Sequence, residues 1–131
     1  IVASFLVKHL RIHWMEGEKH FKNCLVDYNQ ASNIAQWQWV AGCGADAAPY
    51  FRIFNPILQG EKFDKDGIYT KKWVPELLDM PNKFLYKPWE MERKYQEQIK
   101  VVIGKDYPKP IVDHATARNA ALEAFQKIKK N

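Results

Sequence analysis

Three residues at four-residue intervals, Asn29, Asn33 and Trp37, are the best candidates for chemistry in this sequence. On a helix, this spacing places the three side chains on one face. Two amides and an indole make a poor core face, but they suit a polar pocket with an aromatic wall. The pattern leaves one alternative open, in which Trp37 and the nearby Trp39 pack in the core and the two amides face solvent.

Other catalytic or metal-ligating patterns are absent from the sequence. The two cysteines, Cys24 and Cys43, form no Cys-x-x-Cys pair, and there is no P-loop or Gly-x-Gly-x-x-Gly motif. The four histidines do not fall at spacings typical of metal sites or activated nucleophiles; they are His9, His13, His20 and His114. We therefore expect no metal, and two reduced thiols as in a cytoplasmic protein.

The helix that carries the polar stripe is predicted to begin at Asp27 and to run to about Val40. Asp27 is followed three residues later by Gln30, which is typical of a helix N-terminus. Gly42 and Gly44 then favour the end of the helix.

Apolar periodicity and capping residues, among them Asn55 and Asp113, predict further helices, and the absence of strand alternation makes the fold class all-α. The predicted helices are 1–12, 16–26, 56–63, 69–78 and 114–129, with one more near 90–100. Four prolines predict that residues 80–110 are mostly loop. The last helix is expected to bury a stripe of four residues: Ala121, Leu122, Phe125 and Ile128.

The first predicted helix is apolar on most sides, which is typical of a helix inside a larger core. We therefore expect the protein to continue upstream of residue 1. In isolation, the helix would expose apolar surface and favour self-association.

Composition permits a polyanionic partner without requiring one. The net charge is +5. Residues 1–65 contribute +1, from seven Lys/Arg and six Asp/Glu, and residues 66–131 contribute +4, from thirteen Lys/Arg and nine Asp/Glu. Aromatic residues make up 14% of the chain, enough to build stacking sites for bases or ring cofactors. No apolar run approaches the ~18 residues of a membrane span.

Two adjacent segments of the sequence resemble a known family. Residues 27–39, DYNQASNIAQWQW, resemble the flavin-pocket helix of the photolyase/cryptochrome family, and residues 44–56, GADAAPYFRIFNP, resemble the signature of class I cyclobutane pyrimidine dimer photolyases. The likeness continues through QGEKFD (59–64), WVPEL (73–77) and YPKPIV (107–112). It implies that residues 1–131 are the C-terminal part of the helical FAD-binding domain, whose upstream half and N-terminal antenna domain lie outside this chain.

The resemblance assigns cofactor contacts to one segment. Asp27, Tyr28 and Asn29 match residues that contact FAD, with Asp27 pairing with an arginine upstream of this chain. Most relatives carry Asp at the position of Asn29, so this contact loses a charge here. Asn33 matches the asparagine beside flavin N5, where an amide can adapt its hydrogen bonding to the protonation of the flavin.

The resemblance also assigns electron-transfer and DNA-binding residues. Trp14 and Trp37 match two members of the tryptophan chain that carries an electron to oxidised flavin, and the third member would lie upstream. Trp39 matches a residue that lines the cavity for a flipped-out dimer. Arg52 and Gln59 match positions that meet the DNA backbone.

These matches imply light-driven repair of pyrimidine dimers in UV-damaged DNA by electron transfer from reduced FAD. The whole protein is expected to be a monomer with an antenna chromophore of folate or deazaflavin type in its N-terminal domain. The 131 residues alone are expected to be inactive and to hold FAD weakly. Two alternatives are a cryptochrome-type photoreceptor and a non-catalytic basic helical module that binds nucleic acid, but residues 37–39 and 48–52 favour repair over the photoreceptor.

Overall fold

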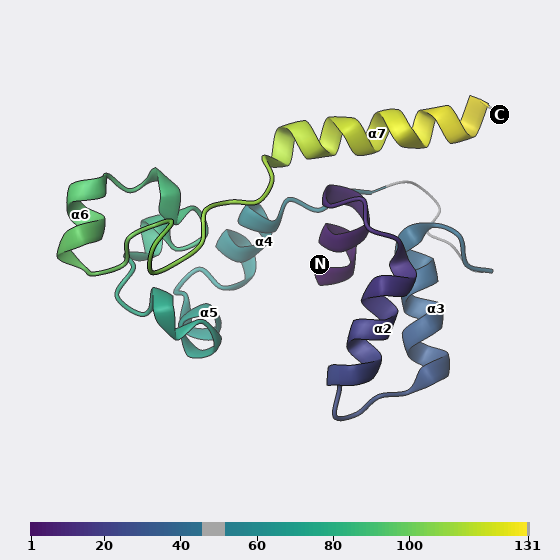
Figure 1. The fold of residues 1–131 in the computed structure, drawn as a ribbon, viewed down its shortest axis with the longest axis horizontal. Helices are drawn as coiled ribbons and strands as arrows, with labels where there is room; N and C mark the ends of the chain where they lie inside the picture. The colour runs from purple at the N-terminus through teal and green to yellow at the C-terminus, as the bar shows by residue number, and fades with distance from the viewer. Residues whose placement is uncertain (46–51, 131) are drawn as a thin grey trace. The chain divides into compact units, whose positions relative to one another are not determined.

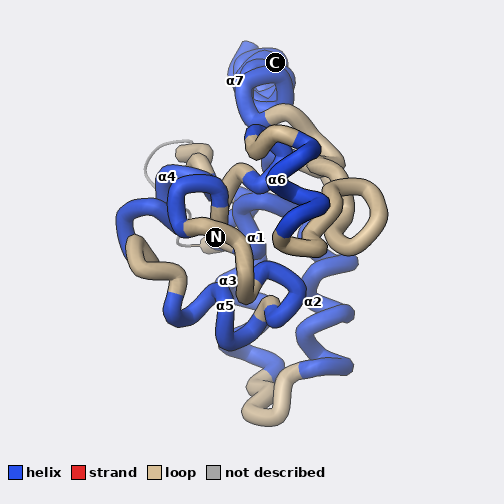
Figure 2. Tube along the Cα trace, turned by 90° about the vertical axis from the view of Figure 1, so that its left-hand side faces the viewer, coloured by secondary structure: helices blue, strands red, loops and turns tan. Residues whose placement is uncertain are grey.

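A computed structural model describes residues 1–45 and 52–130 of the chain (Figure 1). Their regular structure is helical, without a strand, and Ile103 and Tyr107 form an isolated bridge (Figure 2). The predicted all-α class is thus confirmed. The chain divides into two compact units, which we treat separately: unit 1 comprises Ile1–Phe54 and Val112–Asn131, and unit 2 comprises Asn55–Ile111.

Unit 1 is built around two neighbouring helices of the N-terminal half. Its helices are α1 (Val2–Ser4), the π-helix η1 (Phe5–His9), α2 (Trp14–Cys24), α3 (Gln30–Ala41) and α7 (His114–Lys130). Helices α2 and α3 lie side by side, and α1 and η1 pack against them (Figure 1). Helix α7 packs against η1, where His9 Nε2 lies 2.8 Å from His114 Nδ1.

The first helix is shorter than predicted. After Ser4 the backbone widens into a π-helix, with the Leu10 amide donating to the Phe5 carbonyl at 3.1 Å. Arg11 then adopts a left-handed conformation (φ 56°), which ends the helix because this backbone region cannot continue it. The prediction of one helix over residues 1–12 was therefore wrong in its second half.

The second helix is displaced toward the N-terminus of its predicted range. Residues 16–26 were expected, but α2 begins at Trp14 because the His13 ring accepts a hydrogen bond from the Met15 amide at 3.3 Å and caps the helix. The helix ends at Cys24, and Leu25 is extended (φ −73°, ψ 127°).

The helix of the polar stripe begins two residues later than expected. Asn29, not Asp27, is its N-cap, with Oδ1 accepting from the Ser32 amide at 3.0 Å. Asn caps a helix as well as Asp does, so the residue type alone did not select between them. The predicted end is confirmed, because Gly42 adopts φ 75° after the last helical residue, Ala41.

Unit 2 has short helices around an apolar core. They are α4 (Pro56–Phe63), α5 (Ile68–Trp73), α6 (Arg93–Gln98) and the 3₁₀ helices η2 (Pro75–Leu77), η3 (Asn82–Phe84) and η4 (Pro88–Glu90). The helix predicted over residues 69–78 is split, since Pro75 supplies no amide hydrogen and begins a separate 3₁₀ turn. The buried core consists of Leu77, Met80, Leu85, Met91 and Val101.

Two polar side chains tie the loops of unit 2 together. The buried Gln96 donates from Nε2 to the Met91 carbonyl at 2.6 Å and accepts at Oε1 from the Ile103 amide at 3.0 Å. The Asp64 carboxylate accepts from the amides of Tyr69 and Thr70 at 3.1 and 2.8 Å, and from the Tyr86 hydroxyl at 2.8 Å. A segment rich in proline is therefore ordered by side-chain hydrogen bonds in place of long helices.

The last helix has the predicted cap but a shorter buried stripe. Asp113 Oδ2 accepts from the Thr116 amide at 2.9 Å, as expected for an N-cap. Ala121 is buried, whereas Ile128 is 72% exposed, so its prediction as a core residue was wrong. Ile128 lies in the last turn of α7, beyond the part of the helix that packs against η1 at His114.

Candidate functional site

The predicted stripe lines a hollow of about 330 Å³ in unit 1, which we call the α2–α3 hollow. Asn29, Asn33 and Trp37 all contribute to its wall, as the helical spacing predicted. Phe21 from α2 adds a second aromatic side chain, with its ring 5.1 Å from that of Trp37 in an edge-to-face arrangement. Asp27 adds a carboxylate from the loop before α3. The hollow thus combines an aromatic wall with amide and carboxylate groups.

Hydrogen bonds fix the orientation of the Asn33 amide. The Trp37 indole N–H, which can only donate, is 3.0 Å from Asn33 Oδ1. Asn33 Nδ2 therefore faces α2, where it donates to the Glu18 carbonyl and to Glu18 Oε1 at 3.1 and 3.2 Å. Both amide hydrogens are used, while Oδ1 keeps one lone pair. In this arrangement, Asn33 can offer a ligand an acceptor but no donor.

Tyr28 completes the network from the loop before α3. Its hydroxyl donates to Glu18 Oε1 at 3.2 Å, so one carboxylate oxygen receives both the phenol and the Asn33 amide. Desolvation, together with the hydrogen bond to the charged Glu18, raises the pKa of Tyr28 above its ordinary value. The phenol therefore stays protonated and keeps donating to Glu18.

Gly17 makes the position of Trp37 possible. Trp37 is 3% exposed, and a Cβ atom at Gly17 would lie 2.2 Å from its Cη2 atom. No other residue type fits beneath the indole ring without moving it. Sequence reasoning missed Gly17, although an isolated glycine inside a helical pattern is a known sign of close approach. It also missed Glu18, for which no local pattern exists because its partner lies fifteen residues away.

The other predicted cofactor residues are more accessible. Asn29 Oδ1 accepts from the Ser32 amide and keeps one lone pair, so both its Oδ1 and its Nδ2 are available to a ligand. Asp27 is exposed, with its carboxylate on the rim of the hollow.

The structure separates the three predicted functional tryptophans. Trp37 lies in the hollow and is buried. Trp14 is half-buried at the start of α2, with its ring 5.8 Å from that of His13. Trp39 lies outside the hollow and is 43% exposed, so its ring surface is accessible for stacking.

The predicted DNA-contacting residues belong to different units. Arg52 is exposed in unit 1, and its guanidinium lies 4.5 Å from the centre of the Phe54 ring. Lys8 donates to the Arg52 carbonyl. Gln59 is half-buried on α4 of unit 2. Part of the predicted signature, residues 46–51, lies outside the described residues.

The α2–α3 hollow fits one part of a ring cofactor such as FAD. Its volume is at the lower end of ligand-binding pockets (~300–1,000 Å³), so it would hold part of a large cofactor and not the whole molecule. Phe21 and Trp37 supply the apolar wall, and Asn33 Oδ1 supplies a fixed acceptor. Asn29 and Asp27 add polar groups at the rim.

The described residues contain neither a cluster of metal ligands nor a helix that could span a membrane. Within residues 1–45 and 52–130, no three histidine, cysteine or acidic side chains gather as a metal site would require. The same residues contain no helix with the length and apolarity needed to cross a membrane.

Comparison with known proteins identifies the family. The profile of the "FAD binding domain of DNA photolyase" family matches residues 1–127, so the chain belongs to this family. It is 58% identical over 130 residues to a deoxyribodipyrimidine photo-lyase of Agrobacterium fabrum and 49% identical over 130 residues to that of Escherichia coli. These matches cover 99% of the chain but only 27% and 26% of the relatives, so the chain spans about a quarter of their length.

Solved structures agree with this assignment. A bacterial class III photolyase from Agrobacterium tumefaciens superposes on the chain with a TM-score of 0.92 at 57% identity, covering 100% of the chain and 27% of that structure. A Synechocystis cryptochrome gives a TM-score of 0.86 at 39% identity, covering 93% of the chain and 25% of that structure. The expected family and helical fragment are confirmed. The class I subgroup is not confirmed, and the first of these structures is described as class III.

Proposed function

We propose that the protein carrying this chain is a deoxyribodipyrimidine photo-lyase, which repairs cyclobutane pyrimidine dimers in UV-damaged DNA with light. The observation that carries the proposal is the hollow with a buried Trp37 bonded to Asn33, in a chain 58% identical to a photo-lyase. Residues 1–131 would form the C-terminal part of the FAD-binding domain. The upstream half of that domain and an antenna domain, with a folate or deazaflavin chromophore, would complete the protein.

FAD, when bound, would supply the light-driven electron for dimer cleavage. Asn33 would face the flavin ring and present its Oδ1 lone pair, because Trp37 and Glu18 hold the amide in that orientation. Asp27, Tyr28 and Asn29 would bind the cofactor at the rim of the hollow. The neutral Asn29 amide would donate from Nδ2 or accept at the remaining lone pair of Oδ1, whose other lone pair caps α3.

The tryptophans would have two different functions, electron transfer and stacking against the dimer. The buried Trp37 and the half-buried Trp14 would carry electrons between the flavin site and the surface. Trp39 would stack against the dimer after it leaves the duplex, since its exposed ring can replace lost base stacking. Arg52 and Gln59 would bind backbone phosphates around the lesion.

The proposal also includes the cellular location and the oligomeric state of the protein. The thiols of Cys24 and Cys43 are free, as expected for a protein that works in the reducing cytoplasm. We propose that the complete protein is a monomer. The isolated chain would self-associate through the exposed Ile1 and Val2.

The proposal is tested by incubating the complete protein with a dimer-containing oligonucleotide in light and in darkness, under reducing conditions. We expect bound flavin and loss of dimers in the light only. Light-independent loss, or no flavin, would contradict the proposal. The chain alone is expected to lose added FAD on dialysis, because the hollow accommodates only part of the cofactor.

A second candidate function is a flavin photoreceptor, which the similarity to a cryptochrome structure at 39% identity favours. Such a protein would bind flavin and respond to light without removing dimers. The same assay separates the two candidates, because only repair lowers the number of dimers in the oligonucleotide.

A further inference from the structure

Unit 2 contains a second hollow, of about 410 Å³, which none of the predicted site residues enters. We call it the α6 hollow because two of its residues belong to that helix. Its lining residues are Trp89, Arg93, Gln96, Ile103, Lys109 and Pro110. All of them lie in residues 55–111, so the hollow belongs to unit 2 alone.

The buried polar side chain of the α6 hollow already has its hydrogen-bond partners. Gln96 is 5% exposed, and its amide is bonded to the Met91 carbonyl and the Ile103 amide. Ile103 is buried beside it. A ligand would therefore be recognised by the rim, where Trp89 is 42% exposed and offers a free ring surface.

One cation of the rim lies close to a glycine of the neighbouring turn. Gly104 has φ +92°, and a Cβ atom there would lie 2.9 Å from Lys109 Cε. The Lys109 stem thus lies close to the Gly104 backbone, and Lys109 is one of the residues that line the hollow. Its ammonium can bind an anion at this position.

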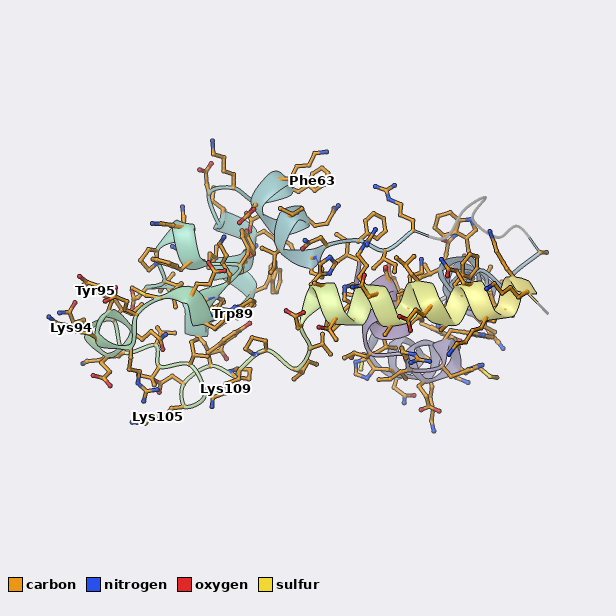
Figure 3. The ribbon with its side chains drawn as sticks, turned by 90° about the horizontal axis from the view of Figure 1, so that it is seen from above. Phe63, Trp89, Lys94, Tyr95, Lys105 and Lys109 are labelled. Atoms are coloured by element: carbon orange, nitrogen blue, oxygen red, sulfur yellow. The ribbon has the colours of Figure 1, made fainter. Side chains whose placement is uncertain are left out.

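One further cation lies near these residues. Lys105 belongs to the same turn as Gly104, whereas Lys94 and Tyr95 of α6 lie away from Trp89 and Lys109 and do not line the hollow (Figure 3). Among the described residues, Lys105 and Lys109 have no carboxylate within ion-pair distance. We define the basic aromatic rim as Trp89, Lys105 and Lys109.

The nearby carboxylates only partly offset these cations. Glu97 Oε1 accepts from Arg93 Nε at 3.2 Å, and Glu90 lies 3.5 Å from Lys87. Asp106 Oδ2 accepts from the Val102 amide at 2.9 Å, but this donor is neutral, so Asp106 keeps its charge next to Lys105 in the sequence. Lys105 and Lys109 together exceed Asp106 by one positive charge.

We propose that the basic aromatic rim binds single-stranded nucleic acid, with a base stacked on Trp89 and the adjacent phosphates bound by Lys105 and Lys109. Cations interleaved with exposed aromatic rings are the combination by which proteins bind single strands without sequence preference. A peptide with acidic residues alone would leave the Trp89 ring without a partner. This binding is distinct from dimer repair, because the strand that binds the rim carries no damage.

The test uses the 131-residue chain and a fluorescent oligothymidine, with anisotropy measured in darkness at several salt concentrations. We expect the double variant Lys105→Glu/Lys109→Glu to weaken binding by at least about tenfold and to reduce the magnitude of the salt slope by about 1.4, which corresponds to two phosphate contacts. Trp89→Ala should weaken binding several-fold and remove the quenching of tryptophan fluorescence by the oligonucleotide.

Matched controls come from α5 of the same unit. Lys71→Glu/Lys72→Glu makes the same change in net charge, and Trp73→Ala removes a ring that is 64% exposed. Both controls should bind within about twofold of the original chain, as surface changes away from an interface do. Lys109→Gln, which keeps most of the stem over Gly104, provides a milder variant if the double variant unfolds.

Three results would overturn the proposal. The first is absence of binding at low salt, and the second is an equal loss of affinity in the α5 controls. The third is competition by thymidine monophosphate as effective as that by the strand, which would make the hollow a mononucleotide site. Because the strand is undamaged and the assay is dark, failure of light-driven repair in the complete protein leaves this test unaffected.

Discussion

The two units bury different kinds of side chain. In unit 1 the buried residues include Ser4, Lys8, His9 and Asn33, whereas the core cluster of unit 2 is made of leucine, methionine and valine. Burying polar groups costs free energy unless each is bonded, and in the described part of unit 1 Ser4 Oγ and His9 Nδ1 have no hydrogen-bond partner. The buried polar side chain of unit 2, Gln96, is hydrogen-bonded beside an apolar cluster, whereas two buried polar groups of unit 1 are not.

The largest effect is expected from the core of unit 2. Leu85 is 2% exposed, so Leu85→Ala should destabilise unit 2 by about 2–5 kcal/mol through lost burial and a residual cavity. Urea denaturation gives the total change, and amide hydrogen exchange assigns it to residues 55–111. Equal loss of protection in α2 and α3 would contradict the assignment of the effect to unit 2.

The next largest effect is expected at Gly17 in unit 1. Gly17→Ala brings a Cβ atom within 2.2 Å of Trp37 and should cost roughly 1–3 kcal/mol by forcing the indole out of place. Tryptophan fluorescence should shift to longer wavelength as Trp37 meets water. The control is Gly44→Ala, whose Cβ would lie 3.3 Å from Gln38 Cβ and should have a much smaller effect. An unchanged fluorescence spectrum in Gly17→Ala would argue against the described packing.

Unit 2 should lose stability in strong acid because of Asp64. Desolvation opposes ionisation of this carboxyl, but hydrogen bonds from Thr70, Tyr86 and the Tyr69 amide outweigh it and lower its pKa to about 2. Since the pKa in the unfolded chain is higher, this group stabilises unit 2 above pH ~4, and the contribution is lost as the pH falls toward 2. Tyr86→Phe removes one of these donors and should cost about 1 kcal/mol near neutral pH and less in acid. If Tyr86→Phe lowered the free energy of unfolding equally at neutral and acid pH, the effect could not be assigned to the Asp64 carboxylate.

Unit 1 should respond to milder acid, with the smallest effect of the series. Burial, and then the charge of His114, lower the pKa of His9 below its ordinary value. The unfolded chain therefore takes up a proton first as the pH falls below ~6.5, and unit 1 loses stability there. His9→Gln should flatten the dependence of thermal stability on pH between neutrality and mild acid. If thermal stability depended on pH equally in His9→Gln and in the original chain, the loss of stability in mild acid would belong to another group.

Local sequence signals predicted the parts of the fold that depend on near neighbours. The spacing of Asn29, Asn33 and Trp37 placed all three at one hollow, because helix geometry alone determines that face. The caps at Asn55 and Asp113 were also predicted, since each bonds an amide two or three residues ahead. The all-α class followed from the same local patterns.

Contacts between distant residues were not predictable from local patterns. Glu18 fixes the Asn33 amide across fifteen residues, and Gly17 accommodates Trp37 across twenty. Both contacts exist because α2 and α3 pack side by side, which no local pattern specifies. The π-helical turn at Phe5–His9 was missed for a similar reason, since the pattern of apolar residues does not distinguish it from an α-helix.

The most direct test of the central claim, that the α2–α3 hollow is the flavin face of a photolyase, compares two tryptophans of α3. In the complete protein, the rate of light-driven flavin reduction is measured for the Trp37→Phe and Trp39→Phe variants. We predict that Trp37→Phe slows flavin reduction by more than an order of magnitude, while Trp39→Phe leaves it unchanged and weakens binding of dimer-containing DNA. Normal flavin reduction in Trp37→Phe, or a loss confined to Trp39→Phe, would contradict the claim.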